Sequence, residues 1–324
     1  MIKMEKSDFT YIDLFAGIGG FHIACKENNG KCVFASEIDK KACKTYKDNH
    51  GMNPYSDITK QDAEKILDFD LLCAGFPCQS FSMVGKRLGF EDTRGTLIYD
   101  VIRILKKKRP KAFILENVQG LLSHDEGRTF YVIRKLLGNR YNKRREFFNN
   151  PDSLEYNIFY KVLNSAYFGL AQNRKRIFSV GFRKGIEGWK DFKFPKGYDK
   201  LRIIKDVLEK NIDDKYYLSK KDIRKLLKKK NRANLKDRLE DINKKSGTII
   251  ASYGSIGSFG SSYLNINNKF RMFTPRECAR LQGFPESFKI HEKDNQAYRQ
   301  FGNAVSPPVV KAIIKEMKKI FIEK

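Results

Sequence analysis

The sequence predicts an α/β fold in which helices cover both faces of a mainly parallel, Rossmann-like sheet, joined to a smaller second domain. Short apolar runs at residues 11–15, 31–36, 69–74 and 112–115 have the length of buried parallel strands, and helical patterns follow several of them. A glycine turn follows the first run. The composition changes after Gly188, where Lys and Asp become dense, and this marks the second domain.

The composition is that of a globular protein. The chain has 324 residues, of which 41% are hydrophobic. No apolar run is long enough for a membrane span, and residues 1–8 are unlike a signal peptide, so we expect a cytoplasmic protein. The six cysteines form no CxxC pair and the four histidines have no metal-ligand spacing. We therefore expect neither a disulfide framework nor a bound metal.

The chain is strongly basic. Its 64 Lys and Arg residues outnumber 38 Asp and Glu residues, which gives a formal net charge of +26. An excess of this size favours a polyanionic partner, most simply nucleic acid. Charged faces that are only solvated are the alternative.

The first strand and its turn indicate a cofactor site. A strand is expected at 11–15, a turn at 16–20, a helix to Asn28 and a second strand at 31–36 that ends at Glu37. An acid twenty residues after Gly17 is typical of sites that hold an adenosine ribose. His22 stands where a pyrophosphate site needs a third small residue, so S-adenosylmethionine fits better than NAD.

Asp57 follows a loop at which a third strand could end. Its carboxylate could accept a hydrogen bond from an adenine amino group. An ordinary turn or cap residue is the alternative.

The next apolar run, 69–74, is stopped by Gly75 and Pro77 and delivers Cys78 just past a strand end. Ligands bind at the carboxyl ends of strands in open α/β sheets, so Cys78 is a candidate nucleophile. A small buried hydrophobic residue is the alternative. Residues 79–96 carry three glycines among polar and basic residues, which is typical of a lid.

A helix over 100–108 and a strand over 112–115 lead to Glu116. A carboxylate at a strand end in a partly dry cleft has a raised pKa and can act as an acid. A surface turn residue is the alternative.

The second half of the large domain presents two arginines. A helix is expected at 125–137, a strand at 156–164 and another at 177–182. Arg174 and Arg176 alternate just before the last strand, so both project to one face, where they could bind phosphate or a base carbonyl. A solvated edge is the alternative.

The remaining segments form the smaller domain and the return to the sheet. A basic helix is expected at 220–230, a strand followed by an adaptable loop at 248–264, and a terminal helix at 309–322. Another helix has clear signals: Thr274 as N-cap, Pro275 at its first position, Glu277 as the capping-box acid and Gly283 at its end.

Six motifs occur in one order: DLFAGIGG, GFPCQSFS, ENV, QNRKR, RECARLQGFP and QFGNAV. Together they resemble the DNA cytosine-5 methyltransferases of bacterial restriction-modification systems, most of all the small HhaI-type enzymes, over residues 11–183 and 270–310. The resemblance implies a Rossmann-like S-adenosylmethionine-dependent methyltransferase domain at 1–188 and a target-recognition domain at 189–270. A hinge at 271–295 and a C-terminal segment at 296–324 would complete it.

The resemblance also implies the chemistry. Cys78 matches the thiolate that adds to C6 of a flipped cytosine, and Glu116 matches the residue that holds or donates a proton at N3, with Asn117 supporting the turn. Arg176 matches the arginine at the base carbonyl, with Arg174 ordering the site. No side chain is an obvious base for the C5 proton.

The match assigns further residues to ligands. For S-adenosylmethionine they are Phe15, Gly17, Ile18, Gly19, Gly20, Glu37, Ile38, Asp57, Ile58, Pro77, Leu97, Asn303 and Ala304. For DNA they are Gln79, Ser82, Lys86, Arg87, Arg94, Ser252, Tyr253 and Gly254.

The resemblance fails where specificity should lie. A charged stretch at 231–245 replaces the glycine-rich recognition loop of HhaI-type enzymes, so the target sequence cannot be transferred. We expect a monomer that acts on double-stranded DNA, with a cognate restriction endonuclease acting separately. A tRNA cytosine-5 methyltransferase is the alternative, although the Cys-Phe-Thr sequence of those enzymes is absent.

Overall fold

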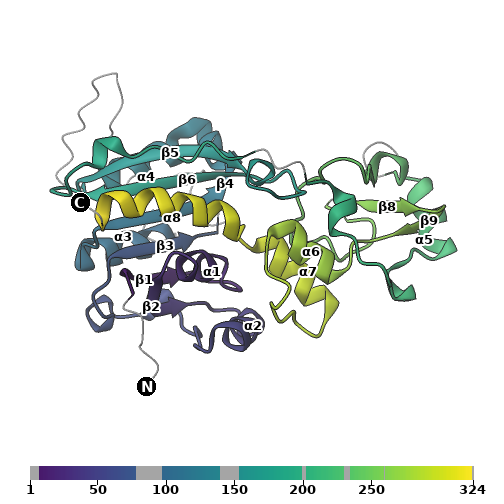
Figure 1. Ribbon diagram of the computed structural model, residues 1–324, viewed down its shortest axis with the longest axis horizontal. Coiled ribbons are helices and arrows are strands. Elements are labelled where there is room, and N and C mark those ends of the chain that lie inside the picture. Colours follow the sequence, from purple (N-terminus) through teal and green to yellow (C-terminus); the bar gives the residue numbers. More distant parts are fainter. Residues whose placement is uncertain are drawn as a thin grey trace.

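The computed structural model describes residues 7–77, 97–138, 153–198, 202–229, 234–258 and 260–322. It has a large lobe built on a six-stranded sheet and a small lobe built on a three-stranded sheet (Figure 1). Six of the expected site residues lie outside the described residues: Cys78, Gln79, Ser82, Lys86, Arg87 and Arg94.

The large sheet has the strand order β2-β1-β3-β4-β6-β5. Its strands are β1 (Phe9–Leu14), β2 (Gly30–Ser36), β3 (Leu71–Gly75), β4 (Ala112–Val118), β5 (Tyr156–Asn164) and β6 (Lys175–Arg183). The first four run parallel, whereas β6 is antiparallel to both β4 and β5. The amino end of β6 therefore lies beside the carboxyl ends of β1 to β4.

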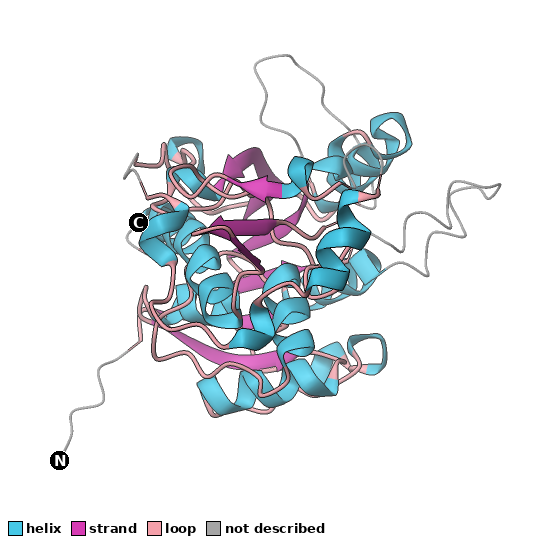
Figure 2. Ribbon diagram, turned by 90° about the vertical axis from the view of Figure 1, so that its right-hand side faces the viewer, coloured by secondary structure: helices cyan, strands magenta, loops and turns pink. Residues whose placement is uncertain are grey.

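Helices cover both faces of this sheet, as Figure 2 shows. On one face lie α1 (Gly20–Lys26) and α8 (Pro307–Phe321), and on the other lie α3 (Leu97–Lys108) and α4 (Arg128–Leu137). Side chains alternate between the two cores: Tyr11 faces α1 and α8, whereas Ile12 and Leu14 face α3. A further helix, α2 (Lys40–His50), follows β2. The expected fold class is confirmed.

The small lobe has its own hydrophobic core. Its elements are α5 (Lys220–Leu227), β7 (Leu239–Glu240), β8 (Tyr263–Ile266) and β9 (Lys269–Arg271). Between the lobes lie α6 (Pro275–Gln282) and α7 (Asp294–Asn303) (Figure 1). The core of the large lobe continues past the expected boundary at residue 188, because the Phe192 ring packs against Phe159 and Phe182.

Most elements agree with the sequence-based expectation, and two differ. The expected helix at 125–137 starts only at Arg128, because Asp125 and Glu126 have φ values of 50° and 54°. The strand expected from residue 248 is absent from the described part of that segment, which forms turns until β8 starts at Tyr263. The predicted signals of α6 are confirmed: Thr274 and Glu277 form a capping box and Gly283 ends the helix with φ 81°.

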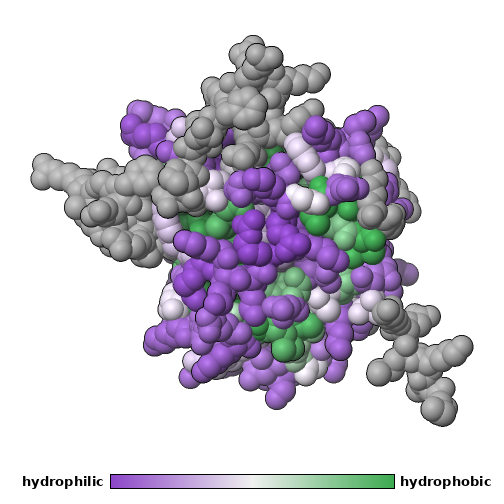
Figure 3. Space-filling model, turned by 90° about the vertical axis from the view of Figure 1, so that its left-hand side faces the viewer, coloured by the Kyte–Doolittle hydropathy of each residue, from purple (hydrophilic) through white to green (hydrophobic). Residues whose placement is uncertain are grey.

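Within the described ranges, no helix combines the length and the apolar character needed to cross a bilayer. The end of the molecule opposite the small lobe is mostly hydrophilic, with separate hydrophobic areas (Figure 3).

Candidate active site

The candidate site lies at one edge of the large sheet. The register pairs Leu14 with both Ser36 and Ala74, Gly75 with Glu116, and Val118 with Arg176. The glycine turn after β1, Glu37 after β2, the Phe76-Pro77 turn after β3, Glu116 in β4 and Arg176 in β6 are therefore neighbours. This is the edge at which open α/β sheets bind ligands.

Glu37 closes the glycine turn. Its Oε2 accepts a hydrogen bond from the Gly17 amide at 2.9 Å, and its Oε1 accepts from the Ile38 and Asp39 amides at 2.8 Å each. The turn needs glycine at Gly19, where φ is 87° and an added Cβ would lie 2.1 Å from Nε2 of His50. A carboxylate has about four lone-pair positions, so Glu37 can still accept a ribose hydroxyl.

Asp13 is a polar residue that sequence reasoning missed. Its carboxylate is fully buried in β1, and neither oxygen has a hydrogen-bond partner among the described residues. Burial raises its pKa well above the usual range, and the charge of Glu37 adds to this. A buried carboxylate without a partner beside the turn fits a ligand that brings positive charge, and S-adenosylmethionine has an ammonium and a sulfonium group. The only signal in the sequence is an acid within an otherwise apolar strand.

The other expected cofactor residues differ in how they can contribute. Phe15 is half-buried with a φ of 55°, and Gly20 is buried at the start of α1. Ile18 and Ile58 are buried, so only their main chains can meet a ligand. The side chains that reach solvent along this edge are Ile38 (65% exposed), Pro77, Leu97 and Asn303, while Ala304 is buried.

Asp57 caps a short 3-10 helix, Ile58–Lys60, and its Oδ1 accepts hydrogen bonds from the amide and hydroxyl of Thr59 at 3.0 and 2.7 Å. The capping role that the sequence left open is therefore present. It leaves Oδ2, which lies 3.8 Å from Nζ of Lys60, available to a ligand.

Glu116 and Arg176 form an ion pair across β4 and β6. Nε of Arg176 lies 3.1 Å from Oε1 of Glu116, and the two side chains are only 15% and 12% exposed. Burial raises the pKa of Glu116, while the charges of Arg176 and Arg174 act in the opposite direction. The structure thus agrees with the expected raised pKa, and Glu116 is not a surface turn residue.

Asn117 fixes the turn that leads to Cys78. Its Nδ2 donates to the carbonyl of Phe76 at 2.9 Å, and its Oδ1 accepts from the Val118 amide at 2.8 Å. The side chain is buried, so these hydrogen bonds are shielded from water. The backbone two residues before Cys78 is therefore tied to the residue that follows Glu116.

Arg174 is placed differently from Arg176. Its side chain is buried, and its guanidinium donates to the carbonyls of Ile249, Gly302 and Ala304 at 2.9, 3.0 and 2.8 Å. Burial, with the nearby charge of Arg176, lowers its pKa to about 9. In this geometry Arg174 orders the main chain and does not point at a substrate.

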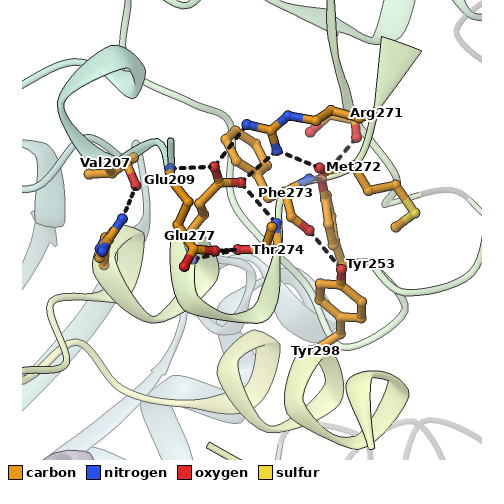
Figure 4. A network of polar contacts seen from close by, with 11 residues as sticks. Val207, Glu209, Tyr253, Arg271, Met272, Phe273, Thr274, Glu277 and Tyr298 are labelled. Atoms are coloured by element: carbon orange, nitrogen blue, oxygen red, sulfur yellow. Dashed lines mark hydrogen bonds and ion pairs between the residues drawn. The ribbon is translucent and has the colours of Figure 1, made fainter. Parts of the chain in front are cut away.

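The expected DNA-reading residues around 252 divide into exposed and buried positions. Ser252 is exposed and Gly254 is half-buried. Tyr253 is fully buried, and its hydroxyl accepts from the Phe273 amide at 2.8 Å and donates to the Ser262 carbonyl at 3.0 Å. This corrects the expectation that Tyr253 contacts DNA, because its side chain supports the loop from inside (Figure 4).

A second buried ion pair joins β9 to α6. The Arg271 guanidinium meets both carboxylate oxygens of Glu277 at 2.7 and 2.8 Å, with side chains only 2% and 0% exposed (Figure 4). Glu277 also accepts hydrogen bonds from the amides of Thr274 and Glu209 at 2.8 and 2.9 Å. The capping box was visible in the sequence, whereas the pairing with Arg271 was not.

Comparison with known proteins agrees with this geometry. Residues 9–319 match the family model described as C-5 cytosine-specific DNA methylase. The chain is 44% identical to the Type II methyltransferase M1.ScrFI of Lactococcus lactis subsp. cremoris over 98% of this chain and 79% of that protein. It is 37% identical to the Type II methyltransferase M.HhaI of Haemophilus parahaemolyticus over 94% of each chain.

The fold is also shared with the Dnmt2 methyltransferase of S. pombe. That similarity has a TM-score of 0.73 and covers 96% of this chain and 98% of the other, at 21% identity. The family match and the Type II relatives confirm the resemblance seen in the sequence. The chain therefore belongs to the C-5 cytosine-specific DNA methylase family, and it is a DNA cytosine-5 methyltransferase that takes its methyl group from S-adenosylmethionine.

Proposed function

We propose that this chain methylates C5 of a cytosine within a specific sequence of duplex DNA, after flipping that base out of the helix. Two contacts support the proposal most directly: the buried Glu116–Arg176 pair and the hydrogen bond from Asn117 to the Phe76 carbonyl. They support the proposal because an acid and a cation lie beside the Phe76-Pro77 turn, which directly precedes Cys78 in the sequence.

The proposed chemistry starts at Cys78, which lies outside the described residues. C5 of cytosine is a poor nucleophile, so the Cys78 thiolate adds to C6 while Glu116 delivers a proton to N3. Arg176 donates hydrogen bonds to the base carbonyl and keeps Glu116 oriented. C5 then takes the methyl group of the cofactor, a base removes the C5 proton, and the C6–S bond breaks to release the Cys78 thiolate. N3 returns its proton to the Glu116 carboxylate, which restores both the base and the acid. No described side chain is assigned as that base.

S-adenosylmethionine supplies an electrophilic methyl group when it is bound. We propose that Glu37 accepts from its ribose and that Asp57 accepts from its adenine amino group. We also propose that Asp13 gives up its proton when the cofactor binds and that its carboxylate then balances the positive charge of the cofactor. Phe15, the 17–20 turn, Ile38, Pro77, Leu97 and the 303–304 turn complete the walls of the site.

Base flipping costs a few kcal/mol of lost stacking and pairing, which contacts to the opened duplex must offset. We propose that the 79–96 segment, with Lys86, Arg87 and Arg94, and the loop around Ser252 and Gly254 provide these contacts. The net charge of +26 favours association with the phosphate backbone.

Transfer of tritiated methyl groups to duplex DNA and to bulk tRNA tests the proposal. We expect label in duplex DNA, and the variant Cys78→Ser should lose transfer while it still binds S-adenosylhomocysteine. Label in tRNA alone, or in neither substrate, would contradict the proposal.

We further propose that the methylation protects DNA from a cognate restriction endonuclease, since relatives of this chain are Type II methyltransferases. Bisulfite sequencing of DNA methylated by the enzyme should reveal one shared target motif. We expect the enzyme to act as a monomer, and light scattering of the purified protein checks this.

A further inference from the structure

Gln172 and Arg174 form hydrogen bonds with the amide and the carbonyl of the same residue, Ile249. Gln172 is fully buried, and its Oε1 accepts from the Ile249 amide at 2.8 Å while its Nε2 donates to the Leu281 carbonyl at 3.1 Å. Nη1 of Arg174 donates to the Ile249 carbonyl at 2.9 Å. Both hydrogen-bonding groups of Ile249 are therefore satisfied by side chains from one short segment of the large lobe.

The same arginine also holds the turn on the cofactor side of the site. Nη2 of Arg174 donates to the carbonyls of Gly302 and Ala304, which flank the exposed residue Asn303. Ile249 and the neighbours of a proposed cofactor residue thus share one guanidinium.

The main chain at Gly302 also lies directly against the main chain at Ile250 and Ala251. A Cβ added at Gly302 would lie 2.3 Å from the carbonyl carbon of Ile250 and from the amide nitrogen of Ala251. No side chain separates the two segments, and a shift in one must displace the other.

Residues 250–258 directly follow Ile249 in the chain, and we name them the Ser252 loop. Its start is set by Ile249, and its middle is held by the Tyr253 hydroxyl on Phe273 and Ser262. Tyr298 packs on the Tyr253 ring at 5.4 Å between centroids and donates to the Phe273 carbonyl (Figure 4). Exposed Ser252 is therefore presented from a loop that is fixed on both sides.

We infer that Gln172 is a positioning residue for methyl transfer, because its hold on the Ile249 amide sets the Ser252 loop against the Gly302–Ala304 turn. The loop proposed to contact the duplex and the turn proposed to contact the cofactor then keep a fixed position relative to each other. The inference rests on the proposed function, in which the Ser252 loop faces DNA.

Three full-length variants separate positioning from simple structural support. Gln172→Met has a similar size and loses both hydrogen bonds. Gln172→Glu keeps an acceptor for the Ile249 amide and loses the donor to Leu281. Thr248→Val is the matched control, because it removes an exposed hydrogen bond to the Asn173 carbonyl in the same segment without touching Gln172 or Arg174.

Each variant methylates plasmid DNA, and bisulfite sequencing gives initial rates at the wild-type motif and at sites that differ from it by one base. The ratio of these rates does not depend on the amount of active enzyme, so a merely structural loss leaves it unchanged. We expect Gln172→Met to lower the ratio by about 10- to 100-fold, since ångström-scale misplacement costs rates of that order. We also expect it to weaken binding of S-adenosylhomocysteine.

Gln172→Glu and Thr248→Val should keep the wild-type ratio. An unchanged ratio in Gln172→Met, or an equal loss in Gln172→Glu, would overturn the inference. If Gln172→Met does not fold, the shorter variant Gln172→Asn takes its place with the same two outcomes. If the wild-type enzyme methylates no DNA in this experiment, the proposed function itself would be refuted.

Discussion

Replacing Arg271 with methionine removes the cation from the Arg271–Glu277 pair while it keeps most of the side-chain volume. Glu277 is 0% exposed and accepts four hydrogen bonds, two of them from Arg271. The variant leaves its carboxylate with two amide donors and no neutralising charge. Loss of one partner from a buried pair costs about 3–5 kcal/mol.

For a protein of this size, about 3–5 kcal/mol corresponds to a fall of roughly 6–20 °C in the unfolding midpoint, at about 2–4 °C per kcal/mol. Differential scanning fluorimetry measures this fall. The double variant Arg271→Met/Glu277→Gln removes the uncompensated charge as well, so it should be more stable than Arg271→Met alone.

Lys311→Met is the control, because it breaks an exposed ion pair with Glu27 whose side chains are 51% and 45% exposed. It should leave the midpoint almost unchanged. A midpoint for Arg271→Met within error of this control, or a double variant less stable than the single one, would refute the reasoning.

Three other substitutions test the site. Glu116→Gln should lower methyl transfer by about 10²- to 10⁴-fold, because it removes the proposed proton donor, with S-adenosylhomocysteine binding retained in calorimetry; activity near wild type would exclude that role. Asp13→Asn should weaken cofactor binding. Because the pKa of Asp13 is raised in the folded state, the folded protein keeps a proton that the unfolded chain releases above about pH 3.9. The free energy of unfolding of the ligand-free wild type therefore falls as the pH rises from about 3.9 to the pKa of folded Asp13. Denaturant titrations at several pH values should show that the free energy of unfolding depends less on pH in Asp13→Asn than in the wild type. An equal pH dependence in the two proteins would contradict the raised pKa of Asp13. Gly302→Ala places a Cβ 2.3 Å from the main chain at Ile250 and should cost at least about 1–3 kcal/mol in thermal unfolding, whereas Gly120→Ala, which points into open space, should be tolerated.

Local signals in the sequence were sufficient for the large sheet and for α6. The strand expected at 156–164 has the observed bounds, and the apolar runs that end at Glu37 and before Glu116 are parallel strands. The side chains of β4 are buried on both faces as far as Leu115, which is why an apolar run bounded by Pro110 and Glu116 identifies it. Thr274, Glu277 and Gly283 mark the ends of α6 because caps are local interactions.

Features that depend on tertiary contacts were not predictable in this way. The segment after Thr248 reads as a strand, but the hydrogen-bonding groups of Ile249 are taken by Gln172 and Arg174. Tyr253 reads as an adaptable loop residue, although its burial depends on Phe273, twenty residues away. The missing partner of Asp13 is likewise a property of the folded site alone.

The central claim is that the Cys78 thiolate bonds to a flipped cytosine beside Glu116 and Arg176. Duplex DNA with 5-fluorocytosine at the target position tests it most directly, because the fluorine blocks loss of the C5 substituent and holds the adduct. Mass spectrometry of the digested complex should find one crosslink, at Cys78, that forms only with S-adenosylmethionine present. A crosslink at another residue, or no crosslink to DNA that the enzyme otherwise methylates, would contradict the account.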